Sequence, residues 1–254
     1  MKNGKSPKAR LGKTGVLGLA RGVVPARYER NLGTLGAAGQ RKLLAARVLV
    51  VGLGGLGGNV LDSLLRLGVG AIVGVDGDVF DETNLNRQPL CEVGNIGRGK
   101  AEAAAERARR VNPAVDFKPY PVRFESLDAK IFKSCALAFD CLDSVPAKLE
   151  LCRRCHAAGV PVVHGAIAGW CGQVGVCPPG DDLLERLYKG FRGRRGAETR
   201  LGNLPFTAAV AAHMMVAAGL PLLLGKPPAK GIRFFDLEPV PGVHKVHKLK
   251  TRAS

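Results

Sequence analysis

The sequence predicts an α/β fold: a doubly wound, mostly parallel Rossmann-like sheet with helices on both faces. Three observations indicate this class. Short apolar runs alternate with segments of helical periodicity from Leu43 onward. A glycine-rich turn joins the first such run to the first helical segment. The chain has 254 residues, 46% of them hydrophobic, which suffices for one domain with a sizeable core.

Four elements are predicted in the first half of the domain. Arg47–Val51 is a short apolar run typical of a buried parallel strand. Val60–Leu67 has apolar residues at helical spacing, and Ala71–Val75 is a second strand. Lys100–Val111, rich in Ala, Glu and Arg, is a helix that stops where Asn112 precedes a proline.

The next strand, Val115–Val122, is predicted at an edge of the sheet. It contains Pro119 and Pro121, which have no backbone N–H and so cannot donate a hydrogen bond to a neighbouring strand. Such residues are tolerated at the edge of a sheet, where one side of the strand has no neighbour. The remaining predicted elements are strands at Ala136–Phe139, Val160–Ile167, Gln173–Cys177 and Ile232–Leu237, and a helix at Pro146–Ala158.

The segment Leu204–Leu224 is nearly free of charge and long enough to span a bilayer. It is also rich in alanine and contains Thr207, His213 and Pro221. We interpret it as a buried core helix or a dimer-interface helix, and we expect no membrane association.

Basic residues dominate the charge: 38 Lys and Arg oppose 21 acidic residues, for a net charge of +17. The excess favours nucleic acid, phosphates or an acidic protein as a partner, without choosing among them. Residues 1–24 hold six basic residues and no acidic one, which predicts a flexible basic arm. Residues 241–254 are predicted as a basic tail, and Lys189 to Arg200 as a mobile loop.

The composition excludes collagen-like, disordered and disulfide-scaffold proteins. Seven cysteines are present and no secretory signal is visible, so we expect reduced thiols and a cytoplasmic location. Cys152 and Cys155 have the spacing of metal ligands, but no second pair accompanies them. We interpret them as structural thiols.

A nucleotide site is predicted at the glycine-rich turn. Its glycines are Gly52, Gly54, Gly55 and Gly57, between a strand and a helix whose first N–H groups can bind phosphate oxygens. Asp76 ends the next strand, where a carboxylate can accept hydrogen bonds from a ribose, although it can also merely cap a turn. This pattern alone is also compatible with an NAD-dependent dehydrogenase.

Charged residues farther along favour a triphosphate over a dinucleotide. Arg87 can hold phosphate oxygens in a fork, and Lys100 supplies a compact charge at the start of a helix. Asp143 follows a strand at the carboxyl edge of the sheet, where it can hold Mg²⁺ against the phosphates. Asp143 can alternatively cap the following helix, a role that Ser144 can also take.

Several ordered motifs between about Arg27 and Gly225 resemble the MoeB/ThiF/HesA family, ATP-dependent adenylyltransferases related to ubiquitin-activating enzymes. The motifs are Arg27-Tyr28-Glu29-Arg30, the glycine turn, Asp76-Gly77-Asp78, Thr83 to Gln88, Gly97 to Lys100, Cys141 to Ser144 and Gly169 to Val174. By this resemblance residues 25–240 are a ThiF-type adenylyltransferase domain.

The resemblance implies roles for single residues. Nucleotide contacts are implied for Gly55, Asp76, Asp78, Asn84, Asn86, Arg87, Lys100, Asp143 and Ser144, with Mg²⁺ held by Asp143. Arg30 is similar to an arginine that reaches the phosphates of a partner's site in a homodimer. The implied reaction joins the C-terminal glycine carboxylate of a small ubiquitin-like sulfur carrier to AMP and releases pyrophosphate.

The chain departs from the family pattern at two points. No cysteine follows Cys177, so the two Cys-x-x-Cys pairs that bind structural zinc in many relatives are absent and no zinc site is expected. Lys189 to Asn203 also lacks the cysteine that some relatives use in a covalent step. Adenylation is compatible with both departures.

Alternative functions stay open. Asp143-Ser144-Val145, Lys148 and the basic surface also resemble the tRNA threonylcarbamoyladenosine dehydratases, which adenylate a carboxylate on tRNA. The run Gly165 to Gly169 favours the carrier-activating branch. A non-catalytic nucleotide-binding module would not require Arg87, Lys100 and Asp143 together.

Overall fold

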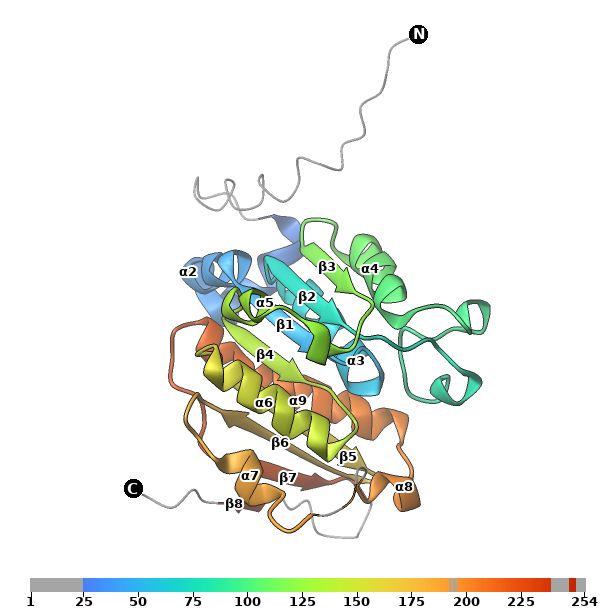
Figure 1. Cartoon of the computed structure of the whole chain (residues 1–254). Coiled ribbons are helices and arrows are strands. Elements are labelled where there is room, and N and C mark those ends of the chain that lie inside the picture. The colour runs from blue at the N-terminus through green and yellow to red at the C-terminus, as the bar shows by residue number, and fades with distance from the viewer. Residues whose placement is uncertain (1–24, 192, 194–195, 239–246, 250–254) are drawn as a thin grey trace.

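The computed structural model describes residues 25–191, 193, 196–238 and 247–249, and contains one eight-stranded sheet (Figure 1). Its strands run in the order β3 (Asp116–Tyr120), β2 (Ala71–Val75), β1 (Arg47–Val51), β4 (Leu137–Asp140), β5 (Val162–Ala168), β6 (Cys171–Cys177), β7 (Ile232–Asp236) and β8 (His247–Leu249). The predicted fold class is confirmed, and β3 lies at the edge of the sheet, as its prolines indicated.

The sheet has a parallel half and an antiparallel half. Every pairing from β3 to β5 is parallel, whereas β6, β7 and β8 each run antiparallel to the strand before them. In the parallel half Val51 pairs with both Val75 and Asp140, and Asp140 pairs with His164. The carboxyl ends of β1, β2 and β4 therefore meet at one edge of the sheet.

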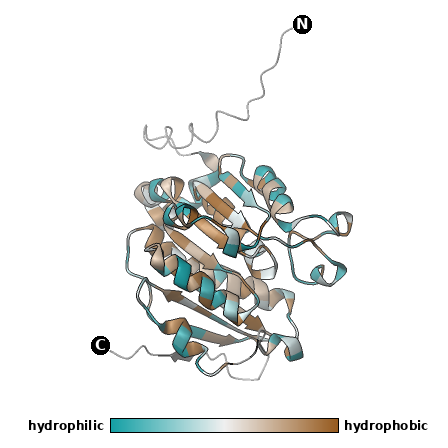
Figure 2. Ribbon diagram, viewed as in Figure 1, coloured by the Kyte–Doolittle hydropathy of each residue, from teal (hydrophilic) through white to brown (hydrophobic). Residues whose placement is uncertain are grey.

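Helices cover both faces of the sheet and create two apolar cores. On one face lie α3 (Gly55–Leu67), α4 (Lys100–Val111) and α9 (Pro205–Leu223), and on the other α5 (Ala129–Lys133), α6 (Val145–Ala157) and α7 (Leu183–Leu187). Strand β1 supplies both cores by alternation: Val48 and Val50 face the first core, and Leu49 and Val51 face the second. Figure 2 shows the resulting pattern, with hydrophobic strands between amphipathic helices.

Helix α9 packs against α3, β5 and β6, which agrees with the interpretation of a core helix. Its Ala208, Ala211 and Met215 are buried. By length and composition alone, α9 is a candidate membrane span, and 44% of its most apolar window is buried within the protein. The small side chains of α9 allow it to approach the sheet closely: a Cβ atom at Gly219 would lie 2.8 Å from Leu137.

Some elements were not predicted. The segment before β1 forms a 3₁₀ helix, Ala26–Asn31, and helix α2, Leu32–Ala45. Glycines lower its helix propensity, and Gly36 has a φ of 63° that kinks the helix, so the sequence pattern is weak. Glu198–Leu201 of the expected mobile loop forms helix α8, while residues 192, 194 and 195 lie outside the described residues.

The predicted basic arm, residues 1–24, lies outside the described residues. Of the predicted basic tail, His247–Leu249 pairs with β7 as strand β8, so these three residues extend the sheet. The basic residues of this segment predicted a solvated tail, but they are also compatible with a strand, because edge strands often carry lysine.

Candidate functional site

A cavity of about 890 Å³ opens at the carboxyl ends of the parallel strands. Its volume is in the range of small-molecule sites. It is lined by the glycine-rich turn, by the ends of β1, β2 and β5, and by side chains from the segments that follow β2, β4 and β6. Gly52, Gly54, Gly55, Asp76, Asp78, Arg87, Lys100, Asp143 and Ser144 all line this cavity, so one pocket unites most of the predicted site residues.

The glycine turn is tight enough to exclude side chains. Gly52 has a φ of 86°, and a Cβ atom there would lie 2.6 Å from the carbonyl oxygen of Cys141. A Cβ atom at Gly57 would lie 1.7 Å from the carbonyl oxygen of Gly52. The backbone therefore turns directly from β1 into α3, and the helix begins at the cavity wall, where its first N–H groups can meet an anion.

Asp76 ties the glycine turn to the end of β2. Its carboxylate accepts hydrogen bonds from the N–H of Leu53 at 2.7 Å and from the N–H of Asp78 at 2.9 Å. Burial raises the pKa of Asp76, and the two hydrogen bonds oppose this shift. Asp76 does cap turns, as the simpler interpretation proposed, but it also lines the cavity. Its contact with a ribose stays a prediction.

Two cations reach the cavity from different elements. Lys100 is the first residue of α4 and only 8% exposed; its ammonium lies 3.5 Å from the carboxylate of Asp78, a side chain that is 79% exposed. The guanidinium of Arg87 donates to the carbonyl of Thr83 at 3.0 Å, and its stem lies against Gly55. Both residues thus line the cavity, Arg87 beside the start of α3 and Lys100 beside Asp78.

In the segment after β4, the structure shows which of Asp143 and Ser144 caps helix α6. The hydroxyl of Ser144 accepts a hydrogen bond from the N–H of Ala147 at 3.4 Å, so Ser144 is the N-cap of α6. Asp143 is exposed and lines the cavity. A carboxylate at this place is an oxygen ligand of the type that Mg²⁺ prefers.

Asn84 and Asn86 are not among the lining residues of the cavity in the described part of the chain, and their contact with a nucleotide stays a prediction. Asn84 is buried, and its side chain and that of Asp81 cap a 3₁₀ turn reciprocally. Asn86 donates to the carbonyl of Asn203 at 3.0 Å and accepts from the guanidinium of Arg87 at 2.9 Å. Both asparagines orient Arg87 because the turn that holds them also carries this arginine.

Arg30 lies at the opposite end of the helices from the cavity. It is exposed on the 3₁₀ helix Ala26–Asn31, whose Tyr28 packs against Gly68 after the end of α3. Because α3 has 13 residues, this place is roughly 20 Å from the start of the helix. Arg30 therefore does not reach the cavity of its own chain, and its action in a partner's cavity stays a prediction.

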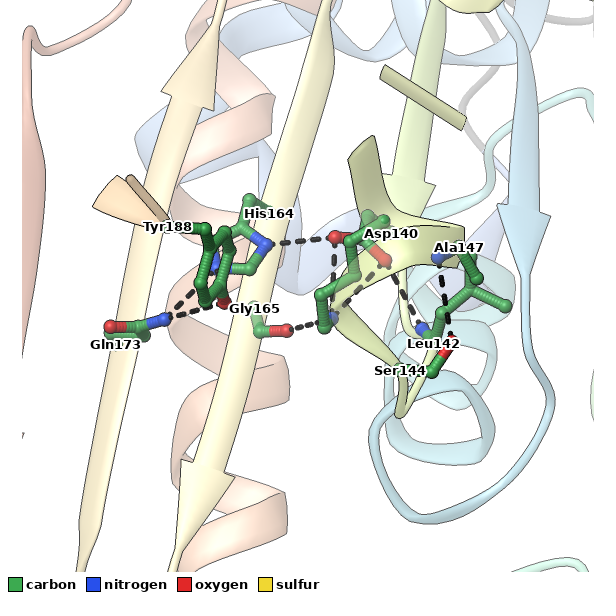
Figure 3. A network of polar contacts seen from close by, with 9 residues as sticks. Asp140, Leu142, Ser144, Ala147, His164, Gly165, Gln173 and Tyr188 are labelled. Carbon is green, nitrogen blue, oxygen red and sulfur yellow. Dashed lines mark hydrogen bonds and ion pairs between the residues drawn. The ribbon is translucent and has the colours of Figure 1, made fainter. Parts of the chain in front are cut away.

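A buried polar network beside the cavity was not predicted (Figure 3). The ammonium of Lys148 lies 3.2 Å from Asp140 and donates to the carbonyl of Gly165 at 2.8 Å. Nδ1 of His164 lies 2.8 Å from the other oxygen of Asp140. The hydroxyl of Tyr188 lies 3.2 Å from Nε2 of His164. Gln173 donates to this hydroxyl at 2.9 Å.

The network assigns charges and protons to its members. Burial disfavours the charge of Asp140, yet Lys148 and the hydrogen bond from His164 hold its pKa below the ordinary value. Burial lowers the pKa of His164, so its ring is neutral at pH 7, with the Nδ1 proton donated to Asp140. The sequence carries no local signal for this set, because its members come from β4, α6, β5, β6 and the segment after α7.

The pair Cys152 and Cys155 is buried on α6. Within the described residues, no group of three or more His, Cys, Asp or Glu side chains is arranged to hold a metal ion. The thiol of Cys152 instead lies 3.5 Å from Nε2 of His156.

Comparison with known proteins gives one family model over most of the chain and relatives that match part of it. The model of the ThiF family matches residues 28–252. The adenylyltransferase and sulfurtransferase UBA4 of Eremothecium gossypii is 40% identical over 154 residues, which are 59% of this chain and 35% of that protein. The SAMP-activating enzyme E1 of Haloferax volcanii is 36% identical over 165 residues, 64% of this chain and 61% of that protein. The chain thus spans less than two thirds of the length of these relatives.

Solved structures share the fold. A crystal structure of E. coli MccB with ATP superposes with a TM-score of 0.70 at 19% identity, covering 89% of this chain and 71% of that chain. The E. coli tRNA N6-threonylcarbamoyladenosine dehydratase TcdA has a TM-score of 0.63 at 24% identity, covering 78% of this chain and 94% of that chain. At these identities the likeness establishes the architecture. It does not distinguish adenylation of a carrier protein from adenylation of tRNA.

Proposed function

Because the chain belongs to the ThiF family, we propose that it is an ATP-dependent adenylyltransferase that activates the C-terminal glycine carboxylate of a small ubiquitin-like sulfur carrier. The observation that carries the proposal is the convergence of Arg87, Lys100 and the start of α3 on one cavity. The names of relatives at 36–40% identity, an adenylyltransferase and an E1 activating enzyme, support it.

The proposed reaction is an in-line substitution at the α-phosphorus of ATP. An oxygen of the carrier's carboxylate forms the new P–O bond, and the bond from this phosphorus to the bridging oxygen of the β-phosphate breaks. Pyrophosphate leaves with the electron pair, and no proton has to move. Arg87 and Lys100 stabilise the negative charge that grows on the leaving group, and the N–H groups of α3 hold the phosphates in place.

The residues present also fit a divalent cation. Asp143 supplies a carboxylate at the cavity wall, and Ser144 performs the capping of α6 in its place. Bound Mg²⁺ would neutralise phosphate charge and favour the departure of pyrophosphate. Asp143 would hold it.

We further propose a homodimer in which Arg30 completes the partner's cavity, since it lies too far from its own. Mixing inactive Arg30→Ala and Lys100→Ala proteins tests this role, because a mixed dimer contains one site with both groups intact. Partial recovery of activity is expected. A strictly monomeric protein, or no recovery in demonstrated mixed dimers, would contradict it.

The central test is ATP–pyrophosphate exchange with a sulfur carrier that ends in Gly-Gly. We expect label from pyrophosphate to enter ATP only when the carrier is present, and not when its last glycine is deleted. Modified tRNA is the second arm of the experiment. Exchange that depends on tRNA and ignores every Gly-Gly carrier would replace the proposed substrate.

A further inference from the structure

The segment between β4 and α6, residues 141–144, is fixed by hydrogen bonds on both sides of Asp143 (Figure 3). Before it, the N–H of Leu142 donates to the carboxylate of Asp140 at 3.2 Å. After it, the hydroxyl of Ser144 caps helix α6. Asp143, which lines the cavity, therefore lies between two residues that are held in place.

Both fixed points depend on Asp140, the last residue of β4. The other partners of its carboxylate are the ammonium of Lys148 at 3.2 Å and Nδ1 of His164 at 2.8 Å. Lys148 belongs to α6 and also donates to the carbonyl of Gly165 in β5 at 2.8 Å. Through Lys148, the helix that Ser144 caps is thus tied to both Asp140 and the sheet.

Stability alone does not account for this buried network. Asp140, Lys148 and His164 are 0%, 3% and 0% exposed, so all three are withdrawn from water. A buried ion pair contributes little net stability, and well-packed apolar side chains of similar volume are often at least as stabilising. Apolar side chains could not, however, accept the N–H of Leu142 or hold the carbonyl of Gly165. What the polar groups add is a defined position for the segment beside them.

We propose that Asp140 and its partner Lys148 are positioning residues, which hold Asp143 in the cavity wall before any ligand binds. The inference rests on the proposed function, in which Asp143 binds Mg²⁺, and adds the groups that preorganise this ligand. Hydrogen-bonding partners orient metal ligands in proteins, and their loss lowers metal affinity by about 10–100-fold. Here the partner acts on the main chain of the residue before the ligand, so we expect the lower end of this range.

The test replaces the three buried side chains together, so that no charge is left unpaired. The triple variant is Asp140→Leu, Lys148→Met, His164→Phe. Its affinity for Mn²⁺, a paramagnetic substitute for Mg²⁺, is measured by electron paramagnetic resonance in complex with an ATP analogue that has a methylene group between the α- and β-phosphates. This analogue cannot release pyrophosphate, so the measurement does not depend on activity. We expect the Kd for Mn²⁺ to rise about tenfold, and the Kd for the metal-free analogue to stay unchanged.

Asp143→Ala connects the network to the metal ligand. By itself it should raise the Kd for Mn²⁺ at least as much as the triple substitution does. In the Asp143→Ala background the triple substitution should cause no further rise, because the group that it positions is absent. Gln40→Met is the control. It removes a buried hydrogen bond to the carbonyl of Leu67, at the far end of α3, and should leave the Kd for Mn²⁺ unchanged.

Hydrogen exchange of the Leu142 N–H gives a test that needs no variant to fold. In the unaltered protein without nucleotide or metal, we expect this N–H to be protected, because Asp140 accepts it. Exchange at the rate of an unstructured peptide would overturn the inference.

Two further outcomes would overturn it: an unchanged Kd for Mn²⁺ in the folded triple variant, or rises from the triple variant and Asp143→Ala that multiply. If Asp143→Ala raises the Kd in the same experiment, the metal site of the proposed function survives either result. An unchanged Kd in Asp143→Ala would instead contradict the proposed metal ligand, and the inference with it. None of these measurements needs a carrier, so they are independent of the pyrophosphate exchange that tests the proposed substrate.

Discussion

Lys100 and Lys148 are both almost fully buried lysines at the same cavity, yet their charges are compensated in different ways. Lys148 is 3% exposed and is neutralised within the protein, by Asp140 and by the carbonyl of Gly165. Lys100 has Asp78 as its acidic neighbour, at 3.5 Å, and that carboxylate is 79% exposed. Water weakens such a pair, so its charge remains available to an anionic ligand. Burial of a charge does not by itself indicate a site; the location of its counter-charge does.

The most direct test of this difference between the two lysines is to remove the charge of Lys148. Lys148→Met keeps the length of the side chain but leaves Asp140 buried with His164 alone. We expect a loss of about 3–5 kcal/mol in the free energy of unfolding, measured with urea at pH 7.5. Lys100→Met is the matched variant, and its loss should be below about 1 kcal/mol. Equal losses in the two variants would refute the distinction.

For catalysis, in contrast to stability, we expect the larger effect from the substitution of Lys100. Lys100→Met is expected to reduce carrier-dependent pyrophosphate exchange by on the order of 100-fold, because a fixed cation beside the leaving group is lost. Arg87→Ala should act in the same direction. Assays at a temperature where both proteins are folded separate this effect from stability. Exchange at the unaltered rate in Lys100→Met would remove this lysine from the site.

The network of Asp140, Lys148 and His164 also predicts a dependence of stability on pH. The pKa of Asp140 and the pKa of His164 are both lower in the folded chain, so the unfolded chain binds more protons on acidification. Stability should therefore fall as the pH drops from 7 to 5.5, where an unfolded histidine gains its proton. His164→Asn removes this proton uptake and should reduce the fall by on the order of 1 kcal/mol. Urea titrations at both pH values measure it, and an unchanged fall would show that His164 does not contribute.

The smallest effect is expected at the outer end of the network. Tyr188→Phe removes the hydroxyl that contacts Gln173 and His164. The cost in unfolding free energy should be about 1 kcal/mol, the usual value for one such hydrogen bond. In a Gln173→Met background the same change should cost less, because one partner is already absent. A full cost in that background would mean that the two side chains do not act together.

Local patterns were enough to predict most of the regular structure. The apolar run Arg47–Val51 forms β1, and the predicted helix Lys100–Val111 is α4 with the same bounds. Helix α2 was not predicted, because its glycines weaken the local preference and tertiary contacts of Gln40 and Leu43 supply the stability. Strand β8 was not predicted either, since pairing with β7 defines it.

Within the site, the sequence by itself determined the groups whose position depends on their neighbours in the chain. The glycine turn, Asp76, Lys100 and Asp143 each stand at the end of a strand or the start of a helix, and parallel strands bring such ends to one edge. Only the tertiary structure decided which side chains enter the cavity. It buried Asn84 outside the cavity lining, placed Gln88 and Asn203 in the cavity wall, and joined Asp140 to His164 in a buried network beside it. Contacts between residues far apart in the chain depend on packing, which leaves no periodic trace in the sequence.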